Sequence, residues 1–269
     1  MPENYRHCFG LHKEPFAADI PRQEILVTRT LTAVCDRIHY AISLGALALI
    51  TGEIGSGKST ALRYVIGDFH PSEYRVLSVT ATSGSILELY RQILAELGVE
   101  NAGASRAKMT RRIKQEVLDL TLGKKMKLAL MIDEASLLRL EVFAELHTLT
   151  QFEQDSKPFL PIILAGQANL IDNLSYRNSQ PLASRVVARC HLSGIDQNTM
   201  QEYLLHHLKI AGVKQMLFDD AAVTAIHQGS GGLFRKANHL ARGALVAAAK
   251  AQESVVSAEH VRRAATELF

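Results

Sequence analysis

One short run of residues has the spacing of a phosphate-binding loop. It reads G-x-x-x-x-G-K-S and consists of Gly52, Glu53, Ile54, Gly55, Ser56, Gly57, Lys58 and Ser59. Glycines let successive backbone N–H groups converge on phosphate oxygens, and a helix that follows directs its positive end at the same anion. We expect Lys58 to reach the β- and γ-phosphates and Ser59 to offer a hydroxyl to Mg²⁺. The loop therefore predicts binding of a nucleoside triphosphate, with the adjoining Thr60 included among the binding residues.

Two carboxylates follow another apolar run, 128–132. We expect Asp133 to hold Mg²⁺, often through water, and Glu134 to activate the attacking water. The alternative interpretation is an acidic strand end that faces solvent. An apolar run that ends in Asp-Glu is a weak signal by itself, but after a phosphate loop it predicts a Mg²⁺-dependent hydrolase of nucleoside triphosphates.

A fold must position these residues, and the order of helical segments and apolar runs along the chain indicates which fold it is. Helical periodicity in the segments 86–97 and 109–122 alternates with short apolar runs, which is typical of an α/β fold with a parallel sheet covered by helices on both faces. The expected strands are 46–51, 75–80, 127–132, 160–166 and 186–192.

The pattern changes after about residue 192, where only helical signals remain. The expected helices are 198–211, 219–228, 233–252 and 258–268. Asp219, Asp220 and Ser257 stand where N-caps belong, and Gly229 and Gly231 mark a helix end. We therefore expect two domains: an α/β nucleotide-binding core over 1–195, including an N-terminal adenine-side segment, and an all-helical lid over 196–269.

Composition excludes several classes of protein. The chain has 269 residues, 47% of them hydrophobic, and a net charge of +3, which permits an anionic partner without requiring one. The longest apolar stretch, 44–50, is too short to cross a bilayer, and the polar start does not resemble a secretory signal. Three scattered cysteines favour reduced thiols and a cytoplasmic location. The histidines lack metal-ligand spacing, and we expect His206 and His207 to be solvated.

With these motifs the chain resembles the AAA+ ATPases, and more narrowly the ExeA/GspA-like group and the transposon-encoded, TnsC-like regulatory ATPases. The resemblance rests on the F-G-L-x-x-x-P-F pattern of 9–16, the loop 51–60, the Leu-Ala-Gly-Gln of 164–167 and the segment 232–238. It implies a five-stranded core with a helical lid, ATP as the nucleotide, and a homo-oligomer, either a ring or a helical filament, as the working state.

The resemblance also implies roles for single residues. Gln167 matches a polar sensor that orients the attacking water, although it is also compatible with a turn-facing side chain. Arg235 matches a lid arginine that senses the γ-phosphate, with Phe234 where the family usually has proline. Arg185 matches the finger that enters the neighbouring subunit's site, and Arg189 is the second candidate. The segment 9–16 has two interpretations: it wraps the adenine or it covers the edge of the core.

The sequence is compatible with two main functions. A third, a nucleotide-dependent scaffold that hydrolyses ATP slowly or not at all, is disfavoured by the intact Glu134. The first is an ATPase that assembles on duplex DNA and regulates a partner such as a transposase, suggested by the cationic stretch 106–114 and by Lys124, Lys125 and Lys127. Such a charge run is also typical of a solvated helix face. The second is an envelope-assembly ATPase of the secretion type. Those relatives continue beyond the lid, whereas this chain ends at Phe269, so we expect the DNA function and no membrane insertion.

Overall fold

The computed structural model describes residues 4–100, 103 and 105–268. These residues form two compact units. The helical unit contains the described residues of 1–28, 53–57 and 193–269, and the α/β unit contains those of 29–52 and 58–192. Each unit has its own hydrophobic core.

The α/β unit is built on a five-stranded sheet with the order β2-β3-β4-β1-β5, in which all pairings are parallel. The strands are β1 (Leu47–Gly52), β2 (Tyr74–Thr80), β3 (Lys127–Asp133), β4 (Ile162–Gly166) and β5 (Val186–Leu192). The expected α/β class and its parallel sheet are confirmed. β1 and β4 are buried along their whole length, which is why they read as continuous apolar runs.

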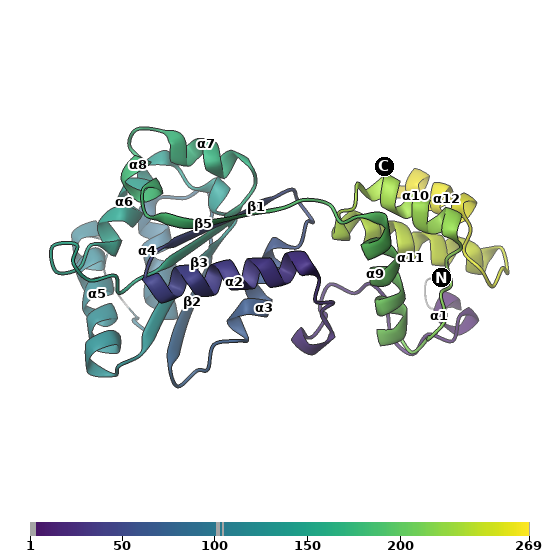
Figure 1. Cartoon of the computed structure of the whole chain (residues 1–269), viewed down its shortest axis with the longest axis horizontal. Coiled ribbons are helices and arrows are strands. Elements are labelled where there is room, and N and C mark those ends of the chain that lie inside the picture. The colour runs from purple at the N-terminus through teal and green to yellow at the C-terminus, as the bar shows by residue number, and fades with distance from the viewer. Residues whose placement is uncertain (1–3, 101–102, 104, 269) are drawn as a thin grey trace. The chain divides into compact units, whose positions relative to one another are not determined.

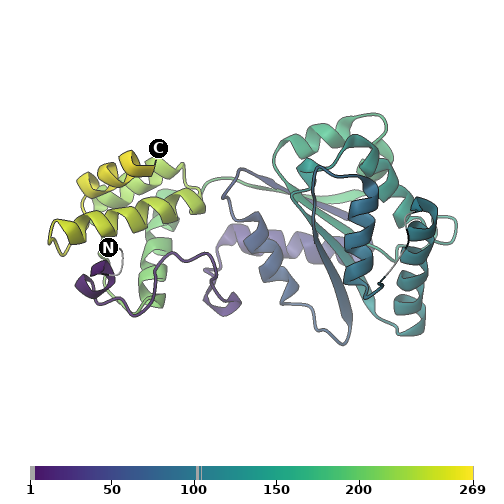
Figure 2. The ribbon, with the colours of Figure 1, turned by 180° about the vertical axis from the view of Figure 1, so that it is seen from behind.

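Helices cover both faces of this sheet (Figures 1 and 2). α2 (Arg29–Leu44) lies on one face, and α4 (Ile86–Glu96) and α5 (Arg106–Leu118) lie on the other. The remaining helices of the unit are α3 (Lys58–Ile66), α6 (Leu140–Thr150), α7 (Asn169–Ser175) and α8 (Gln180–Ala183). The helix expected over 109–122 begins earlier, at Arg106, and its last residues form a π turn, Asp119–Gly123.

The helical unit consists of α1 (Asn4–Cys8), α9 (Gln197–Ile210), α10 (Asp220–Ser230), α11 (Phe234–Lys250) and α12 (Ala258–Leu268), with a 3₁₀ turn at Arg22–Glu24. The Asp219 carboxylate accepts the N–H of Ala222 at 2.6 Å and so caps α10 as expected. Gly231 ends that helix in the left-handed conformation. Among the described residues, no helix is long and apolar enough to cross a bilayer.

The N-terminal segment packs into the helical unit. Tyr5, Phe9, Leu11 and Phe16 belong to the core that the C-terminal helices form, and Figure 2 shows α1 beside the long helix α11. Arg242 of α11 donates to the Phe16 carbonyl oxygen at 2.8 Å and pairs with Glu14. This grouping differs from the expected division, which assigned residues 1–28 to the nucleotide-binding core. Apolar side chains with helical partners far along the chain explain the difference.

His207 is buried, so the expectation that it is solvated is wrong. Only 5% of its surface is exposed, and its ring stacks on Phe16 with the centroids 5.2 Å apart. Burial, with a smaller effect of His206, lowers the pKa of His207 to about 4, so the ring is neutral at neutral pH. His206 is half-buried and its Nε2 lies 2.6 Å from the Glu24 carbonyl oxygen. Both histidines thus serve the packing of the N-terminal segment.

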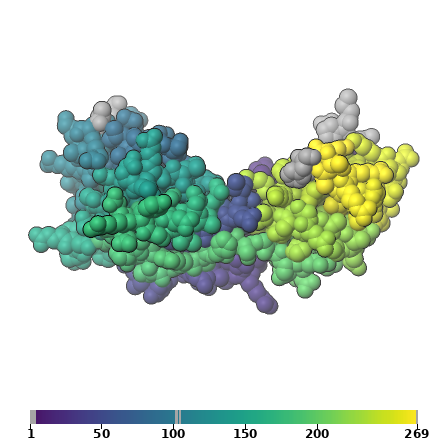
Figure 3. Space-filling view, turned by 90° about the horizontal axis from the view of Figure 1, so that it is seen from above, coloured from purple at the N-terminus to yellow at the C-terminus, as the bar shows by residue number. Residues whose placement is uncertain are grey.

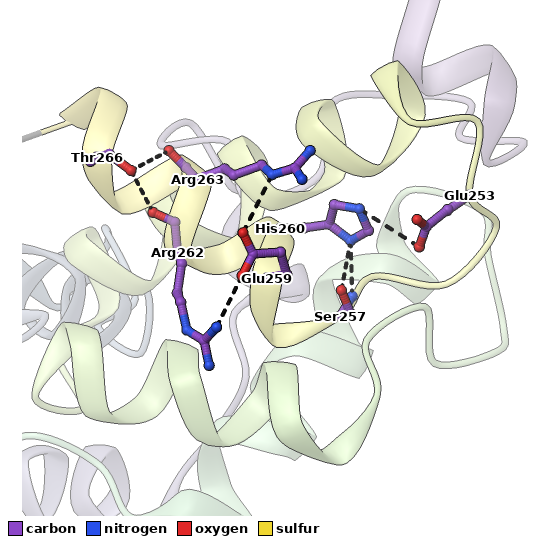
Figure 4. A network of polar contacts seen from close by, with 7 residues as sticks. All are labelled: Glu253, Ser257, Glu259, His260, Arg262, Arg263 and Thr266. Carbon is purple, nitrogen blue, oxygen red and sulfur yellow. Dashed lines mark hydrogen bonds and ion pairs between the residues drawn. The ribbon is translucent and has the colours of Figure 1, made fainter.

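Two contacts from Ser257 to the His260 ring lie at the start of α12 (Figure 4). The Ser257 N–H donates to His260 Nδ1 at 3.1 Å, and the Ser257 hydroxyl lies 3.1 Å from the same nitrogen. His260 Nε2 faces the Glu253 carboxylate at 3.7 Å. The backbone contact corresponds to one of the two hydrogen bonds of a capping box, with histidine in the place of glutamate. α12 packs against α11, and Figure 3 shows the C-terminal residues, in yellow, at the surface.

Candidate functional site

The carboxyl ends of three adjacent strands carry the predicted chemistry of the α/β unit. β1 ends at Gly52, β3 ends at Asp133, and β4, between them, ends at Gly166 just before Gln167. Because the strands are parallel, their carboxyl ends meet at one edge of the sheet. The structure therefore brings Gly52, Asp133, Glu134 and Gln167 to the same edge.

Lys58 stands at the beginning of α3, directly after the loop. Its side chain is buried, with 6% of the residue exposed, and Nζ donates to the Gly52 carbonyl oxygen at 3.0 Å. Burial of an ammonium group is unusual unless it is paired or serves an anion. Ser59 and Thr60 follow in the first turn of α3, where N–H groups are free to meet a phosphate.

The central residues of the loop, 53–57, belong to the helical unit. Gly55 and Gly57 have φ of 85° and 97°, which only glycine adopts readily. A Cβ on Gly55 would lie 2.7 Å from Cβ of Arg235, and the Arg235 N–H donates to the Gly55 carbonyl oxygen at 3.3 Å. The Ser56 hydroxyl is buried and has no hydrogen-bond partner within the described chain. The loop thus has a glycine, Gly55, where its backbone lies close to Arg235. It also has a buried hydroxyl, that of Ser56, from which a bound ligand can accept a hydrogen bond.

These residues fit a triphosphate with Mg²⁺. In the α/β unit, Lys58 and the N-terminal turn of α3 are donors suited to phosphate oxygens, and in the helical unit the Ser56 hydroxyl is another such donor. The described residues contain no cluster of three His, Cys, Asp or Glu side chains able to hold a metal alone. A Mg²⁺ ion at this edge would therefore share its coordination between Ser59, Asp133 and the phosphates, as Mg²⁺ commonly does.

Glu134 takes an unusual backbone conformation next to Asp133. Its φ is 52°, in the left-handed region that glutamate rarely adopts. The Asp133 carboxylate accepts the Glu134 N–H at 2.8 Å, which stabilises this turn. Both residues are half-buried. The chain therefore leaves β3 abruptly, so that the two successive carboxyl groups do not follow strand alternation.

Ser136, which the sequence reasoning did not single out, links the ends of β3 and β4. Its hydroxyl accepts the N–H of Gln167 at 3.2 Å, and its carbonyl oxygen accepts from Asn173 of α7 at 3.5 Å. A Cβ on Gly166 would come within 2.8 Å of the Ser136 nitrogen, so glycine is required there. Gln167 is half-buried beside the site, and its role as sensor stays a prediction.

The structure does not bring Arg185 to this edge. Arg185 precedes β5, and its carbonyl oxygen accepts the N–H of Leu47 at the amino end of β1. It therefore lies about 20 Å along the strands from Gly52. Its guanidinium pairs with Asp155. Arg189 is exposed on β5, an edge strand of the sheet.

The cationic stretch 106–114 is partly engaged in internal contacts. Arg106 pairs with Glu145 at 2.9 Å, and Arg112 pairs with Glu116 at 2.6 Å. Lys114 donates to the Gln151 carbonyl oxygen at 2.9 Å, and partial burial lowers its pKa. Lys108, Arg111, Lys124, Lys125 and Lys127 are also exposed, and Lys127 Nζ lies over the Tyr74 ring, 5.2 Å from its centroid.

Comparison with known proteins agrees with this geometry. Residues 42–174 match the family model for an AAA domain. The chain is 27% identical over 245 residues to General secretion pathway protein A of Aeromonas hydrophila, an alignment that covers 91% of this chain and 45% of that protein. The chain thus spans less than half the length of this curated relative.

Solved structures share the fold. Cdc6p from Pyrobaculum aerophilum superposes with a TM-score of 0.72 at 14% identity, covering 94% of this chain and 70% of that chain. The Aeropyrum pernix ORC1 protein, solved in complex with DNA, gives 0.67 at 17% identity, with coverages of 93% and 68%. Residues 42–174 are thus similar to an AAA domain, and the chain shares the fold of these solved structures.

Proposed function

We propose that this chain is a Mg²⁺-dependent ATP hydrolase whose subunits assemble on duplex DNA and regulate a protein partner such as a transposase. One observation carries the oligomeric part of the proposal. Lys58 and Asp133 lie at the carboxyl edge of the sheet, whereas Arg185 lies at its amino edge. A subunit cannot bring its own Arg185 to its own phosphate loop, so an Arg185 that acts on the nucleotide acts from a second copy.

Each residue has a distinct task in the proposed reaction. Lys58 and the N–H groups of the loop bind the phosphates, and Ser59 with Asp133 holds the metal. Bound Mg²⁺ supplies positive charge next to the transferring phosphoryl group. Glu134 accepts the proton of the attacking water, and Gln167, positioned by Ser136, orients that water. Arg235 senses the γ-phosphate from the same chain, and Arg185 reaches it from the neighbouring subunit.

Lys58→Ala is expected to weaken ATP affinity on the order of 10- to 100-fold, because charge-assisted hydrogen bonds to phosphate are lost. Equilibrium titration with a fluorescent, non-hydrolysable ATP analogue measures this. Lys124→Ala, which removes an exposed lysine from the π turn region, is the matched control and should bind normally. An unchanged affinity in Lys58→Ala, in a protein that melts like the wild type, contradicts the assignment.

The DNA assignment is supported by the exposed cations of α5 and of 124–127, and by the DNA complex solved for one protein of this fold. We expect duplex DNA to bind more tightly with the ATP analogue than without it, and more weakly when the salt concentration is raised from 50 to 200 mM, since counterion release drives such binding. Fluorescence anisotropy measures both dependences. Affinity that is undetectable, or indifferent to both nucleotide and salt, excludes this function.

Assembly of the cell envelope is the second candidate, supported by the similarity to General secretion pathway protein A over 91% of the chain. In that case DNA leaves the hydrolysis rate unchanged, and sedimentation with purified cell wall depends on ATP. The two functions share the same ATPase site, so the Lys58→Ala result does not distinguish them and the DNA titration does.

A further inference from the structure

A strained turn between α6 and β4 places a carboxylate on Arg185. Three consecutive residues of this turn, Glu153, Gln154 and Asp155, have φ of 46°, 55° and 71°. Side chains other than glycine rarely adopt this left-handed region, and three in a row are unusual. The turn is closed by hydrogen bonds from the N–H and the hydroxyl of Ser156 to the Glu153 carbonyl oxygen, at 3.2 and 2.7 Å.

The base of the turn is firmly anchored. Phe152 is buried, with 4% exposed, and its ring packs against Phe159 with the centroids 5.7 Å apart. Lys114 Nζ lies over the Phe152 ring at 5.7 Å and also binds the Gln151 carbonyl oxygen. An antiparallel bridge joins Phe152 to Lys157. The surrounding structure therefore holds the unfavourable backbone and fixes where Asp155 lies.

The Asp155 carboxylate accepts a hydrogen bond from the Arg185 guanidinium, and the two form an ion pair. This hydrogen bond holds the pKa of Asp155 below its usual range. His147 of α6 is the other titratable group in the cluster, and burial followed by the charge of Arg185 lowers its pKa. His147 is therefore neutral at neutral pH, and Asp155 is the counter-ion of Arg185.

We infer that Asp155 is a latch that holds Arg185 in the free subunit and gives it up to the nucleotide of a neighbouring subunit. The inference rests on the proposed function of Arg185 as a residue that acts across the subunit interface. A guanidinium binds a carboxylate and a phosphate with the same planar fork of N–H groups, so the two anions compete for it.

Exposure makes the exchange feasible. The Arg185 and Asp155 side chains are 24% and 45% exposed. Ion pairs with this degree of solvation are worth little, whereas a fully buried pair is expensive to break. A phosphate that carries more charge than a carboxylate, bound with Mg²⁺ in a neighbouring site, therefore displaces Asp155. The Asp155–Arg185 ion pair therefore regulates assembly. The interface between two subunits closes only when the neighbouring subunit holds a nucleotide that can take Arg185 from Asp155.

The test is Asp155→Asn, with Glu153→Gln as the matched control. Both variants remove one negative charge from the same turn, but only the first touches Arg185. Asparagine tolerates the left-handed conformation, so the turn survives. ATP hydrolysis is measured against protein concentration at saturating ATP. Asp155→Asn should lower the concentration of half-maximal activity by roughly two- to fivefold, the worth of a solvated ion pair, without lowering the maximal rate. Glu153→Gln should match the wild type.

Three other outcomes overturn the latch. A lower maximal rate in Asp155→Asn means that Asp155 orients Arg185 for catalysis instead of restraining it. A concentration dependence equal to that of Glu153→Gln means that the pair has no regulatory effect. If Asp155→Asn also promotes ATP-dependent assembly, measured by sedimentation, when it is added to Arg185→Ala, the carboxylate does not act through Arg185. If Arg185→Ala alone hydrolyses ATP at the wild-type rate, Arg185 does not act on the nucleotide of a neighbouring subunit. That result contradicts the proposed function and is distinct from the three outcomes above, which contradict only the role of Asp155.

Discussion

Arg185→Ala is expected to reduce ATP hydrolysis by the assembled protein about a thousandfold, while ATP binding by the single subunit stays normal. An arginine that reaches a neighbouring site neutralises charge on the transferring phosphoryl group, and such residues are worth factors of this size. The expected separation of the two effects follows from the position of Arg185 at the amino edge of the sheet, about 20 Å from its own Gly52. Phosphate release and analogue binding are the two measurements.

Mixing experiments show whether active sites are shared. A Lys58→Ala subunit retains Arg185 but binds nucleotide weakly, and an Arg185→Ala subunit binds nucleotide but lacks the arginine finger. Neither hydrolyses ATP by itself, yet their mixture should regain part of the wild-type rate. Arg189→Ala serves as the control that separates the two candidate arginines, since Arg189 is exposed on β5. A mixture as inactive as its components argues for a role of Arg185 within its own subunit.

Glu134→Gln is expected to slow turnover by about 10²- to 10⁴-fold, the usual contribution of a general base, with ATP affinity nearly unchanged. Glutamine has the same shape but does not accept the proton, and the contact of the Glu134 N–H with Asp133 involves only the backbone of residue 134. Single-turnover phosphate release gives the rate, and analogue titration gives the affinity.

Glu141→Gln is the control for that substitution, because Glu141 is an exposed carboxylate in the first turn of α6. It should hydrolyse ATP at the wild-type rate. Undiminished turnover in Glu134→Gln rules out Glu134 as the base.

The predictable part of this molecule is the part encoded by neighbouring residues. β1, β3 and β4 are short and almost wholly apolar, and β2 and β5 contain shorter apolar runs, so each expected strand lies within two residues of its observed bounds. The phosphate loop and the Asp133–Glu134 pair are local motifs, and parallel pairing then requires their strand ends to meet at one edge. Asp219 is predictable as an N-cap because its hydrogen bond spans only three residues.

What escaped prediction depends on contacts between distant residues. The Ser136–Gln167 hydrogen bond spans 31 residues, and nothing local to Ser136 indicates it. His207 looks like a polar residue on an exposed helix until Phe16 covers it. Arg106 belongs to a basic run, but its ion pair with Glu145 comes from a helix 39 positions away. Burial and pairing of such residues are properties of the tertiary structure, which sequence periodicity does not encode.

The position of the N-terminal segment sets an order for folding. Phe16 and Arg242, joined by a hydrogen bond, are 226 residues apart in the chain. A ribosome releases the segment first and its helical partners only after the whole α/β unit. Phe9 and Phe16 therefore stay without their core until α11 has emerged, and the helical unit is the last to close. Closure over so long a loop is slow, so this step is expected to limit the rate of folding. Until α11 has been synthesised, the apolar side chains of the N-terminal segment are exposed in the nascent chain. Exposed apolar side chains of this kind are what chaperones bind.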